Sequence, residues 1–467
     1  MPNPSQILRN KFPHAPTAGQ EQLFEMMNDF IEGGSDGRQI LLLKGYAGTG
    51  KTSMVSLMVQ VLPLFNLKYF LLAPTGRAAK VMANYSKKVA FTIHKIIYKS
   101  TSDKSGFLKF KRQRNYSKDT VFIVDEASML SESSDFGKTG LLTDLINYVF
   151  ENPTNKLILV GDSAQLPPVG QTISPGLDKG YLESSYHTSV KEVLLTEVMR
   201  QSEGSGILRN ATAIRDTLGQ AKIEIRMDTK SFKDIFRMTA QKMEDGIRYA
   251  YDKYGMENVI IICRSNFAAN QYNEFIRRNI HFYEEEIEAG DVLMVVKNNY
   301  YYTPDDTPGG FLANGDFAVI EKIVNTEERY GFRFATLQMK LMDYPDQEGF
   351  EAKVMLDTLH VKGPSLPYEE LQRLQQEVSE DYADLDNQKK RNEAIRDDPY
   401  VNALQVKFAY ALTCHKSQGG QWKAIFVDQG YLPDEKVDEE YVRWLYTAVT
   451  RATDELFLLN FKPNFFC

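Results

Sequence analysis

The sequence has few of the residues that build disulfide frameworks or zinc sites. Its 467 residues include three cysteines, Cys263, Cys414 and Cys467, with no paired or metal-like spacing, and six scattered histidines. Reduced thiols of this kind are typical of the cytoplasm. No apolar run approaches the roughly 20 residues that cross a membrane, and the start Met1-Pro2-Asn3-Pro4 lacks the pattern of a signal peptide. These absences predict a soluble, cytoplasmic protein without a metal cluster.

Acidic residues are in slight excess, which argues only weakly against nucleic acid as a partner. The net charge is −7, but between Lys87 and Lys118 ten lysines and arginines stand against one acid, Asp103, so that this segment carries +9 and the remainder −16. Cations interleaved with stackable rings suit single-stranded or forked nucleic acid; a solvated loop is the alternative. The rings in the segment are Phe91, Tyr98, Phe107, Phe110 and Tyr116.

A glycine-rich loop follows a buried apolar run near the N-terminus. After Ile40–Leu43 the chain reads Gly45-Tyr46-Ala47-Gly48-Thr49-Gly50-Lys51-Thr52-Ser53, and the order strand, loop, helix is the one that a phosphate-binding loop requires. The glycines allow backbone N–H groups to converge on phosphates at a helix N-terminus. We expect Lys51 to contact the β- and γ-phosphates and Thr52 to hold Mg²⁺. The segment therefore predicts binding of ATP with Mg²⁺.

Two further apolar runs end in polar residues. Val121–Val124 leads into Asp125 and Glu126, and Leu157–Val160 leads towards Gln165. The carboxyl ends of parallel strands lie at the same edge of a sheet, beside the phosphate loop. Asp125 is then placed to hold Mg²⁺, Glu126 to orient or deprotonate the attacking water, and Gln165 to bond the γ-phosphate or that water. A surface turn is the alternative for both segments, and it is the more plausible for the proline-rich one that holds Gln165.

Further motifs lie before and after these segments. They occupy residues 16–20, 73–79, 92–95, 195–201, 411–419 and 446–452. Together with the phosphate loop, the Asp-Glu-Ala-Ser box at 125–128 and Gly-Asp-Ser-Ala-Gln-Leu-Pro-Pro at 161–168, their order resembles superfamily 1 helicases. The branch is the one that includes RecD, Pif-type proteins and phage Dda. The resemblance covers nearly the whole chain.

The resemblance implies roles for individual residues. Gln20 is expected to read adenine, and Arg200 and Arg451 to act as arginine fingers, because charge gathers on a γ-phosphoryl group during its transfer. A solvated or salt-bridged side chain is the commoner state of an arginine and is the alternative for both. The residues expected to contact the DNA backbone are Pro74, Thr75, Arg77, Thr92, His94, Thr413, His415 and Lys416.

The basic and aromatic segment occupies the position where related helicases carry a pin that splits the duplex. Residues 107–111 alternate between apolar and basic side chains, as a strand does, and residues 102–106 have the composition of a turn. We expect Phe107 and Phe110 to contact DNA at the tip of this hairpin.

The expected fold is α/β, a P-loop NTPase with two RecA-like parallel-sheet motor domains and two small inserted β-rich domains. The polar segment at 366–398 is interpreted as a solvated helix. Strands of the second motor domain are expected at 259–263, 291–296, 406–412, 424–427 and 456–459. The expected domains are residues 1–95 with 119–200, the hairpin 96–118, residues 201–314 with 401–467, and the small unit 315–400.

These observations predict an ATP-dependent DNA helicase, expected to be a monomer, that acts on single-stranded DNA and forks in repair or recombination. The direction, 5′ to 3′, is implied by the resemblance alone. Two alternatives stay open. One is an ATP-gated switch that clamps DNA without unwinding it. The other is a single-stranded-DNA-binding subunit of a helicase–nuclease repair complex.

Overall fold

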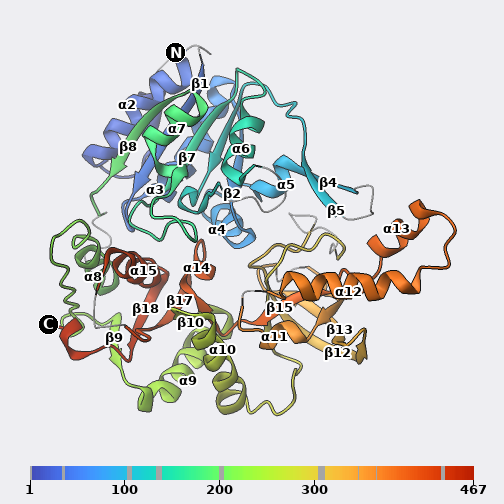
Figure 1. Cartoon of the computed structure of the whole chain (residues 1–467). Coiled ribbons are helices and arrows are strands. Elements are labelled where there is room, and N and C mark those ends of the chain that lie inside the picture. Colours follow the sequence, from blue (N-terminus) through green and yellow to red (C-terminus); the bar gives the residue numbers. More distant parts are fainter. Residues whose placement is uncertain are drawn as a thin grey trace.

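A computed structural model describes most of the chain as two α/β lobes, one above the other in Figure 1. The described residues are 3–33, 37–102, 108–132, 139–198, 204–302, 311–344, 347–363, 365–432 and 437–467, with the backbone alone at 100–102 and 108–110. Among the helices within these ranges, none combines the length and apolar character that a bilayer span needs.

The first lobe is a six-stranded parallel sheet with helices on both faces. Successive residues of its central strands point to opposite sides, so Leu41 and Leu43 pack with one set of helices, whereas Ile40 and Leu42 pack with the other. The strand order is β3-β2-β6-β7-β1-β8. The strands are β1 (Arg38–Gly45), β2 (Lys68–Ala73), β3 (Ala90–Thr92), β6 (Thr120–Val124), β7 (Lys156–Gly161) and β8 (Thr188–Leu195). Helices α1 (Pro4–Lys11), α2 (Ala18–Glu32), α3 (Lys51–Val61) and α4 (Gly76–Ser86) cover one face, and α5 (Ile93–Ile97), α6 (Leu141–Val149) and α7 (Lys179–Tyr186) the other.

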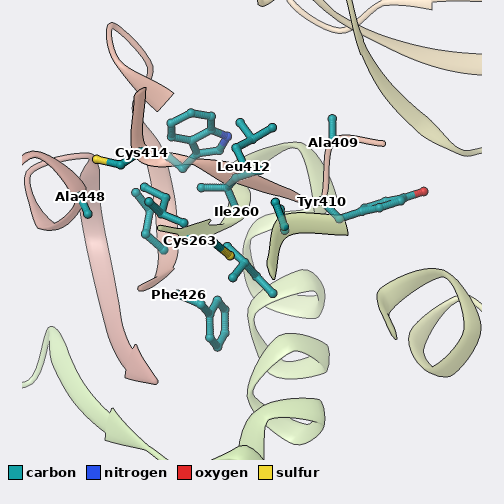
Figure 2. Packing of buried hydrophobic residues seen from close by; sticks show 14 of the residues in the cluster. Ile260, Cys263, Ala409, Tyr410, Leu412, Cys414, Phe426 and Ala448 are labelled. Carbon is teal, nitrogen blue, oxygen red and sulfur yellow. The ribbon is translucent and has the colours of Figure 1, made fainter. Parts of the chain in front are cut away.

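The second lobe is built on a five-stranded parallel sheet of order β16-β10-β17-β18-β9. Figure 2 shows part of its core, to which β10 contributes Ile260, β17 contributes Phe426 and α15 contributes Ala448. The strands are β9 (Ile235–Met238), β10 (Val259–Cys263), β16 (Ala411–Thr413), β17 (Trp422–Asp428) and β18 (Ala452–Leu459). The helices are α8 (Gly206–Arg215), α9 (Met243–Tyr254), α10 (Asn266–Phe275), α14 (Cys414–Ser417) and α15 (Glu439–Val449). Two parallel sheets confirm the predicted fold class.

A closed five-stranded barrel is inserted into the second lobe. It consists of β11 (Val292–Val295), β12 (Phe317–Arg329), β13 (Phe332–Leu341), β14 (Phe350–Met355) and β15 (Leu404–Phe408). The expectation that strands at 291–296 and 406–412 both belong to the second parallel sheet is therefore wrong. β11 pairs with β12 and β15, and only β16 from the later run joins the sheet.

The physical reason is that a short, fully buried apolar run has the same pattern in a parallel sheet and in a small barrel. The side chain of Asn273 marks the change from one to the other. Its amide oxygen accepts hydrogen bonds from the N–H groups of Tyr410 and Ala411, at 3.0 and 2.8 Å, where the chain passes from β15 to β16. The domain limits given above stay predictions.

The two remaining inserts lie at 98–112 and 368–396. Strands β4 (Tyr98–Ser102) and β5 (Leu108–Arg112) pair as an antiparallel hairpin, and the residues between them, including Phe107, lie outside the described ranges. Helix α12 (Tyr368–Asp381), followed by α13 (Gln388–Arg396), buries Leu374 and Val378 with barrel residues such as Phe334. The interpretation of this segment as a merely solvated helix is corrected, because one apolar stripe of α12 is part of a core.

Candidate nucleotide site and nucleic-acid contacts

The phosphate loop connects β1 to α3 at the carboxyl edge of the first sheet. Gly48 and Gly50 have φ angles of 76° and 86°, in the left-handed region where side chains with a Cβ are strained. Gly50 directly precedes the first residue of α3, so the helix begins without a capping side chain. Free N–H groups at the first turn of a helix, together with its dipole, favour a bound phosphate.

Lys51 lies over this loop. Its ammonium donates hydrogen bonds to the carbonyl oxygens of Gly45 and Tyr46, at 2.7 and 2.9 Å. Both acceptors belong to the loop itself, so an ammonium at this position can exchange one of them for a phosphate oxygen without moving far. This arrangement supports the predicted contact of Lys51 with the phosphates.

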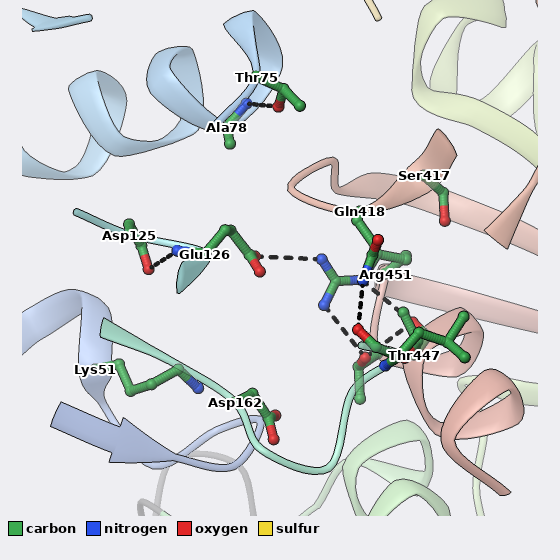
Figure 3. Close-up of polar contacts among 12 residues, drawn as sticks. Lys51, Thr75, Ala78, Asp125, Glu126, Asp162, Ser417, Gln418, Thr447 and Arg451 are labelled. Carbon is green, nitrogen blue, oxygen red and sulfur yellow. Dashed lines mark hydrogen bonds and ion pairs between the residues drawn. The ribbon is translucent and has the colours of Figure 1, made fainter. Parts of the chain in front are cut away.

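Asp125 and Glu126 follow β6, and the side chain of Glu126 points towards Arg451 of the second lobe (Figure 3). The two oxygens of Asp125 accept hydrogen bonds from the Tyr85 hydroxyl at 2.6 Å and from the N–H of Glu126 at 2.8 Å. Glu126 has φ 52°, a strained backbone conformation for a residue with a long side chain. Burial raises the pKa of Glu126, and the nearby Arg451 partly opposes that rise. A carboxylate of raised pKa is better suited to accept a proton from water.

Thr52 and Asp125 supply oxygen atoms of the kind that Mg²⁺ prefers. Each carboxylate oxygen of Asp125 accepts one hydrogen bond and keeps a further lone pair for a metal. Within the described ranges, no group of three or more His, Cys, Asp or Glu side chains is close enough to hold a metal by itself. The residues therefore fit an ion that brings water and phosphate oxygens as its other ligands, and Mg²⁺ stays a prediction.

Arg451 reaches this site from the second lobe. It follows the end of α15, and its Nη1 lies 3.5 Å from Oε1 of Glu126. Its Nε donates to the carbonyl oxygen of Thr447 at 3.2 Å, which holds the guanidinium against its own helix. The other predicted finger, Arg200, lies outside the described ranges.

The turn after β7 carries Gln165. Asp162 begins the turn and accepts a hydrogen bond from the N–H of Ala164 at 2.9 Å. Gln165 is buried, and its Oε1 has no hydrogen-bond donor among the described residues. A buried acceptor without a donor has a free-energy cost unless a bound group supplies one. Such an oxygen is suited to orient a water molecule, as predicted for Gln165.

Gln20 lies beside the loop, but its amide is already engaged. Its Oε1 accepts from the N–H of Thr17 at 3.0 Å, as part of the capping box of α2, and its Nε2 donates to the carbonyl oxygen of Thr49 at 3.3 Å. The side chain therefore connects α2 to the phosphate loop. Adenine contact by Gln20 stays a prediction.

Two predicted DNA contacts on the first lobe are N-caps of helices. The Thr75 hydroxyl accepts from the N–H of Ala78 at 3.2 Å at the start of α4, and the Thr92 hydroxyl accepts from the N–H of Lys95 at 3.3 Å at the start of α5. Burial lowers the pKa of His94 to about 4, so at neutral pH it would contact DNA as an uncharged side chain. Pro74 precedes Thr75 at the end of β2.

Arg77 makes a contact within the chain that the sequence did not predict, and its contact with DNA stays a prediction. Its guanidinium lies between the rings of Phe317 and Trp422, 4.5 and 4.1 Å from their centroids. One turn later, Lys80 pairs with Asp343 at 3.3 Å. These side chains dock α4 of the first lobe onto the barrel and the second lobe. The residues next to them in the sequence form no pattern that indicates such a contact.

The second-lobe candidates lie at the end of β16. Thr413 and Lys416 line a narrow groove along α10, and Lys416 donates to the side chain of Asn314 at 2.8 Å. Burial lowers the pKa of Lys416 to about 8 and also lowers the pKa of His415. Asn266 and Lys407 line the same groove.

The lobes also meet at Gly419. Its φ is 74°, and a Cβ added there would lie 2.6 Å from the Cβ of Ala78 and 3.4 Å from the hydroxyl of Thr75. Glycine is therefore required both by its backbone conformation and by the close approach of α4. Of the predicted pin residues, Phe107 lies outside the described ranges, and Phe110 is described only through its backbone pairing with Ser100.

Family comparisons agree with the motifs. The AAA domain family matches residues 19–235, and the UvrD-like helicase C-terminal domain family matches residues 408–459. The first match covers the first parallel sheet, and the second covers β16 to β18 with α15. Both matches place the two halves of a helicase motor in the predicted order.

Curated relatives are distant. Protein R530 of Acanthamoeba polyphaga mimivirus, which has no assigned function, is 26% identical over 90% of this chain and 94% of its own length. The ATP-dependent DNA helicase dda of Enterobacteria phage T4 is 24% identical over 60% of each chain. The ATP-dependent RecD2 DNA helicase of Deinococcus radiodurans is 27% identical over 38% of this chain and 21% of its own. The chain thus spans less than two thirds of the two named helicases.

The comparison with solved structures finds Pif1 helicases. The Pif1 helicase from Bacteroides in complex with ADP-AlF3 and single-stranded DNA has a TM-score of 0.48 at 14% identity, over 97% of this chain and 95% of that chain. The Pif1 helicase from Candida albicans has a TM-score of 0.47 at 15% identity, over 97% and 96%.

Proposed function

We propose that this chain, a superfamily 1 DNA helicase of the branch that includes RecD, Pif-type proteins and Dda, moves 5′ to 3′ along single-stranded DNA and opens duplex DNA at forks. The observation that carries the proposal is the meeting of Glu126 and Arg451 across the two lobes. A hydrolytic base on one motor lobe and a cation on the other are the parts that ATP-driven closure brings together.

In this proposal the first lobe holds the nucleotide. Backbone N–H groups of the loop and Lys51 bind the phosphates. Thr52 and Asp125 would hold Mg²⁺, which would neutralise charge on the phosphate oxygens. Glu126 accepts a proton from the attacking water, whose position is set by Gln165. Each of these groups lies at the end of a strand in a rigid sheet, which limits its movement during the reaction.

The second lobe completes the site only when the lobes are close. Arg451 turns from Glu126 towards the γ-phosphoryl group and stabilises its charge. Thr75 on the first lobe and Thr413 on the second are both expected to bind the DNA backbone. When the two lobes open and close, the DNA contact of one lobe therefore moves along the strand relative to the contact of the other. Contacts of this type bind phosphate and sugar without reading sequence.

The test is a strand-displacement assay with forks that carry only a 5′ or only a 3′ single-stranded tail. We expect unwinding of the 5′-tailed fork alone, with ATP hydrolysis strongly stimulated by single-stranded DNA. Both activities should weaken steeply with salt, because the contacts are mainly with phosphates. Hydrolysis that is the same with and without nucleic acid would contradict the proposal, and unwinding of the 3′-tailed fork would reverse the assigned direction.

A further inference from the structure

A buried tyrosine connects the two lobes at the nucleotide site. Tyr446 lies on α15 and is 1% exposed. Its hydroxyl oxygen accepts a hydrogen bond from the N–H of Ala47 at 2.8 Å, and the hydroxyl donates to Oδ2 of Asp162 at 2.7 Å. Ala47 belongs to the phosphate loop, and Asp162 starts the turn that carries Gln165. One hydroxyl of the second lobe therefore contacts two catalytic segments of the first.

The contacts of Tyr446 with Ala47 and Asp162 are made by the protonated hydroxyl group. Burial and the nearby Asp162 raise the pKa of Tyr446 well above its ordinary value, so the hydroxyl keeps its proton at neutral pH. Each partner is itself held in place. The other oxygen of Asp162 accepts from the N–H of Ala164 at 2.9 Å, and the N–H of Tyr46, next to Ala47, donates to Leu195 at the end of β8 at 3.3 Å.

The same helix leads to the arginine finger. Arg451 follows Tyr446 by five residues, and the guanidinium is bonded to the carbonyl oxygen of Thr447 on the last turn of α15. The Thr447 hydroxyl in turn accepts from the N–H of Leu166 at 2.8 Å. The position of Arg451 relative to the phosphates therefore depends on how α15 sits on the loop and on the turn after β7.

We propose that Tyr446 is a positioning residue for ATP hydrolysis, whose hydroxyl aligns α15, and with it Arg451, on the phosphate loop and Asp162. The proposal rests on the proposed function. A misplacement of about 1 Å at a reacting group can lower a rate by roughly 10²-fold, so a single lost contact at this point has a measurable effect on turnover.

Tyr441 is a second buried tyrosine of α15, and it serves as a comparison for the positioning role proposed for Tyr446. It is also on α15 and 1% exposed, and its ring packs beside Trp444, with 5.4 Å between the centroids. Its hydroxyl lies beside the side-chain amide of Gln429, which belongs to the same lobe. Tyr441→Phe therefore removes the same atom from the same helix without touching the first lobe, and it is a matched control.

The experiment compares Tyr446→Phe, Tyr441→Phe and the unmodified chain. For each we would measure DNA-stimulated kcat, KM for ATP, and the affinity for a fluorescent ADP with and without aluminium fluoride, which mimics the transferring phosphoryl group. We expect Tyr446→Phe to lower kcat by roughly 10- to 100-fold with ADP affinity nearly unchanged. The tightening by aluminium fluoride should be lost, because it depends on Arg451. Tyr441→Phe should keep all three properties.

A double variant tests whether Tyr446 acts through Arg451. In an Arg451→Ala background, Tyr446→Phe should cause no further loss of kcat, whereas independent effects would multiply. Unchanged kcat in Tyr446→Phe, equal losses of kcat and ADP affinity, or multiplied losses in the double variant would each overturn the proposal. Failure of the proposed function is distinguishable, because the unmodified chain would then hydrolyse ATP at the same rate with and without DNA.

Discussion

Glu126 and Arg451, which are 325 positions apart in the chain, meet at 3.5 Å between the two motor lobes. Arg451 is almost fully buried and Glu126 is partly buried. Removing one partner of such a pair leaves a buried charge without compensation, which is costly. The contact therefore connects the two lobes. It also holds the guanidinium of Arg451 close to the place where this group is proposed to act on the γ-phosphate.

Lys51→Ala should abolish ATP hydrolysis and leave the fold intact. Among the described residues, the ammonium donates hydrogen bonds to carbonyl oxygens of its own loop alone. Its loss therefore removes charge from the phosphates but no core packing. Losing electrostatic stabilisation of this kind costs on the order of 3 kcal/mol of barrier, or more than about 10²-fold in rate. Steady-state ATPase with DNA would measure it, with thermal unfolding as the control for folding. Near-normal turnover would show that this loop is not the active site.

The ATPase should lose activity towards acid pH through protonation of Glu126. Burial raises the pKa of this group, and a general base acts only when it is deprotonated. The rate should therefore fall as the pH drops through that raised pKa, which lies above the value of an exposed glutamate. In Glu126→Gln the residual ATPase rate should be low and should not fall further at acid pH. If the rate of this variant shows the same fall at acid pH, another group is responsible for it.

Asp316→Asn should stabilise the protein at alkaline pH. Burial raises the pKa of Asp316 to about 7, while an unfolded aspartate titrates near 4. The folded state thus keeps a proton that the unfolded state has lost, and the free energy of unfolding falls as pH rises from about 4 to 7. Asparagine removes this loss of unfolding free energy, which is at most on the order of 4 kcal/mol. Its side-chain oxygen can still accept the hydrogen bond that the N–H of Ala313 donates to Asp316 at 2.7 Å.

Calorimetric Tm values of both proteins at pH 5 and pH 8 would check this effect. The gain in Tm from Asp316→Asn should be larger at pH 8 than at pH 5. A gain of the same size at both values would mean that Asp316 does not titrate in this range, and a loss at pH 8 would mean that its negative charge is needed beside Arg77.

Shortening the hairpin should separate unwinding from hydrolysis. Replacing residues 102–111 by two glycines removes the last residue of β4 and most of β5, which form a two-stranded sheet separate from that of the first lobe. Base–aromatic stacking at such a tip is worth roughly 1–3 kcal/mol per base. We expect DNA-stimulated ATPase and movement on single strands to persist, while duplex unwinding collapses. Fork assays beside single-strand ATPase measure both, and an equal fall in ATPase would assign the segment to the motor.

The parts of the site whose position in the fold could be predicted from the sequence are those in which structure and chemistry share one short segment. The phosphate loop is an example, because the apolar strand before it, its glycines and Lys51 are all neighbours in the chain. Asp125 and Glu126 are another, since four buried residues directly before them identify a strand end. The predicted function agrees with the family matches for the same reason.

The barrel was not predictable in the same way. Val292–Val295 is buried on both faces in the barrel, as it would have been in the sheet, so its pattern could not distinguish the two. Arg77 matched a DNA-contact motif, yet the rings that surround its guanidinium come from residues 317 and 422. Neither the strand pairing of β11 nor the ring contacts of Arg77 can be recognised from the neighbouring residues in the sequence.

The sequence by itself determined several central strands of the two sheets, the loop that is expected to bind phosphate, and the order of two motor halves along the chain. Only the tertiary structure decided that Tyr446 reaches Ala47, that Tyr85 bonds Asp125, and that Arg451 lies against Glu126. The physical reason is the range of the forces involved. Burial patterns and backbone preferences act over a few neighbouring residues, whereas a hydrogen bond between residues 399 positions apart exists only after both lobes have folded and packed.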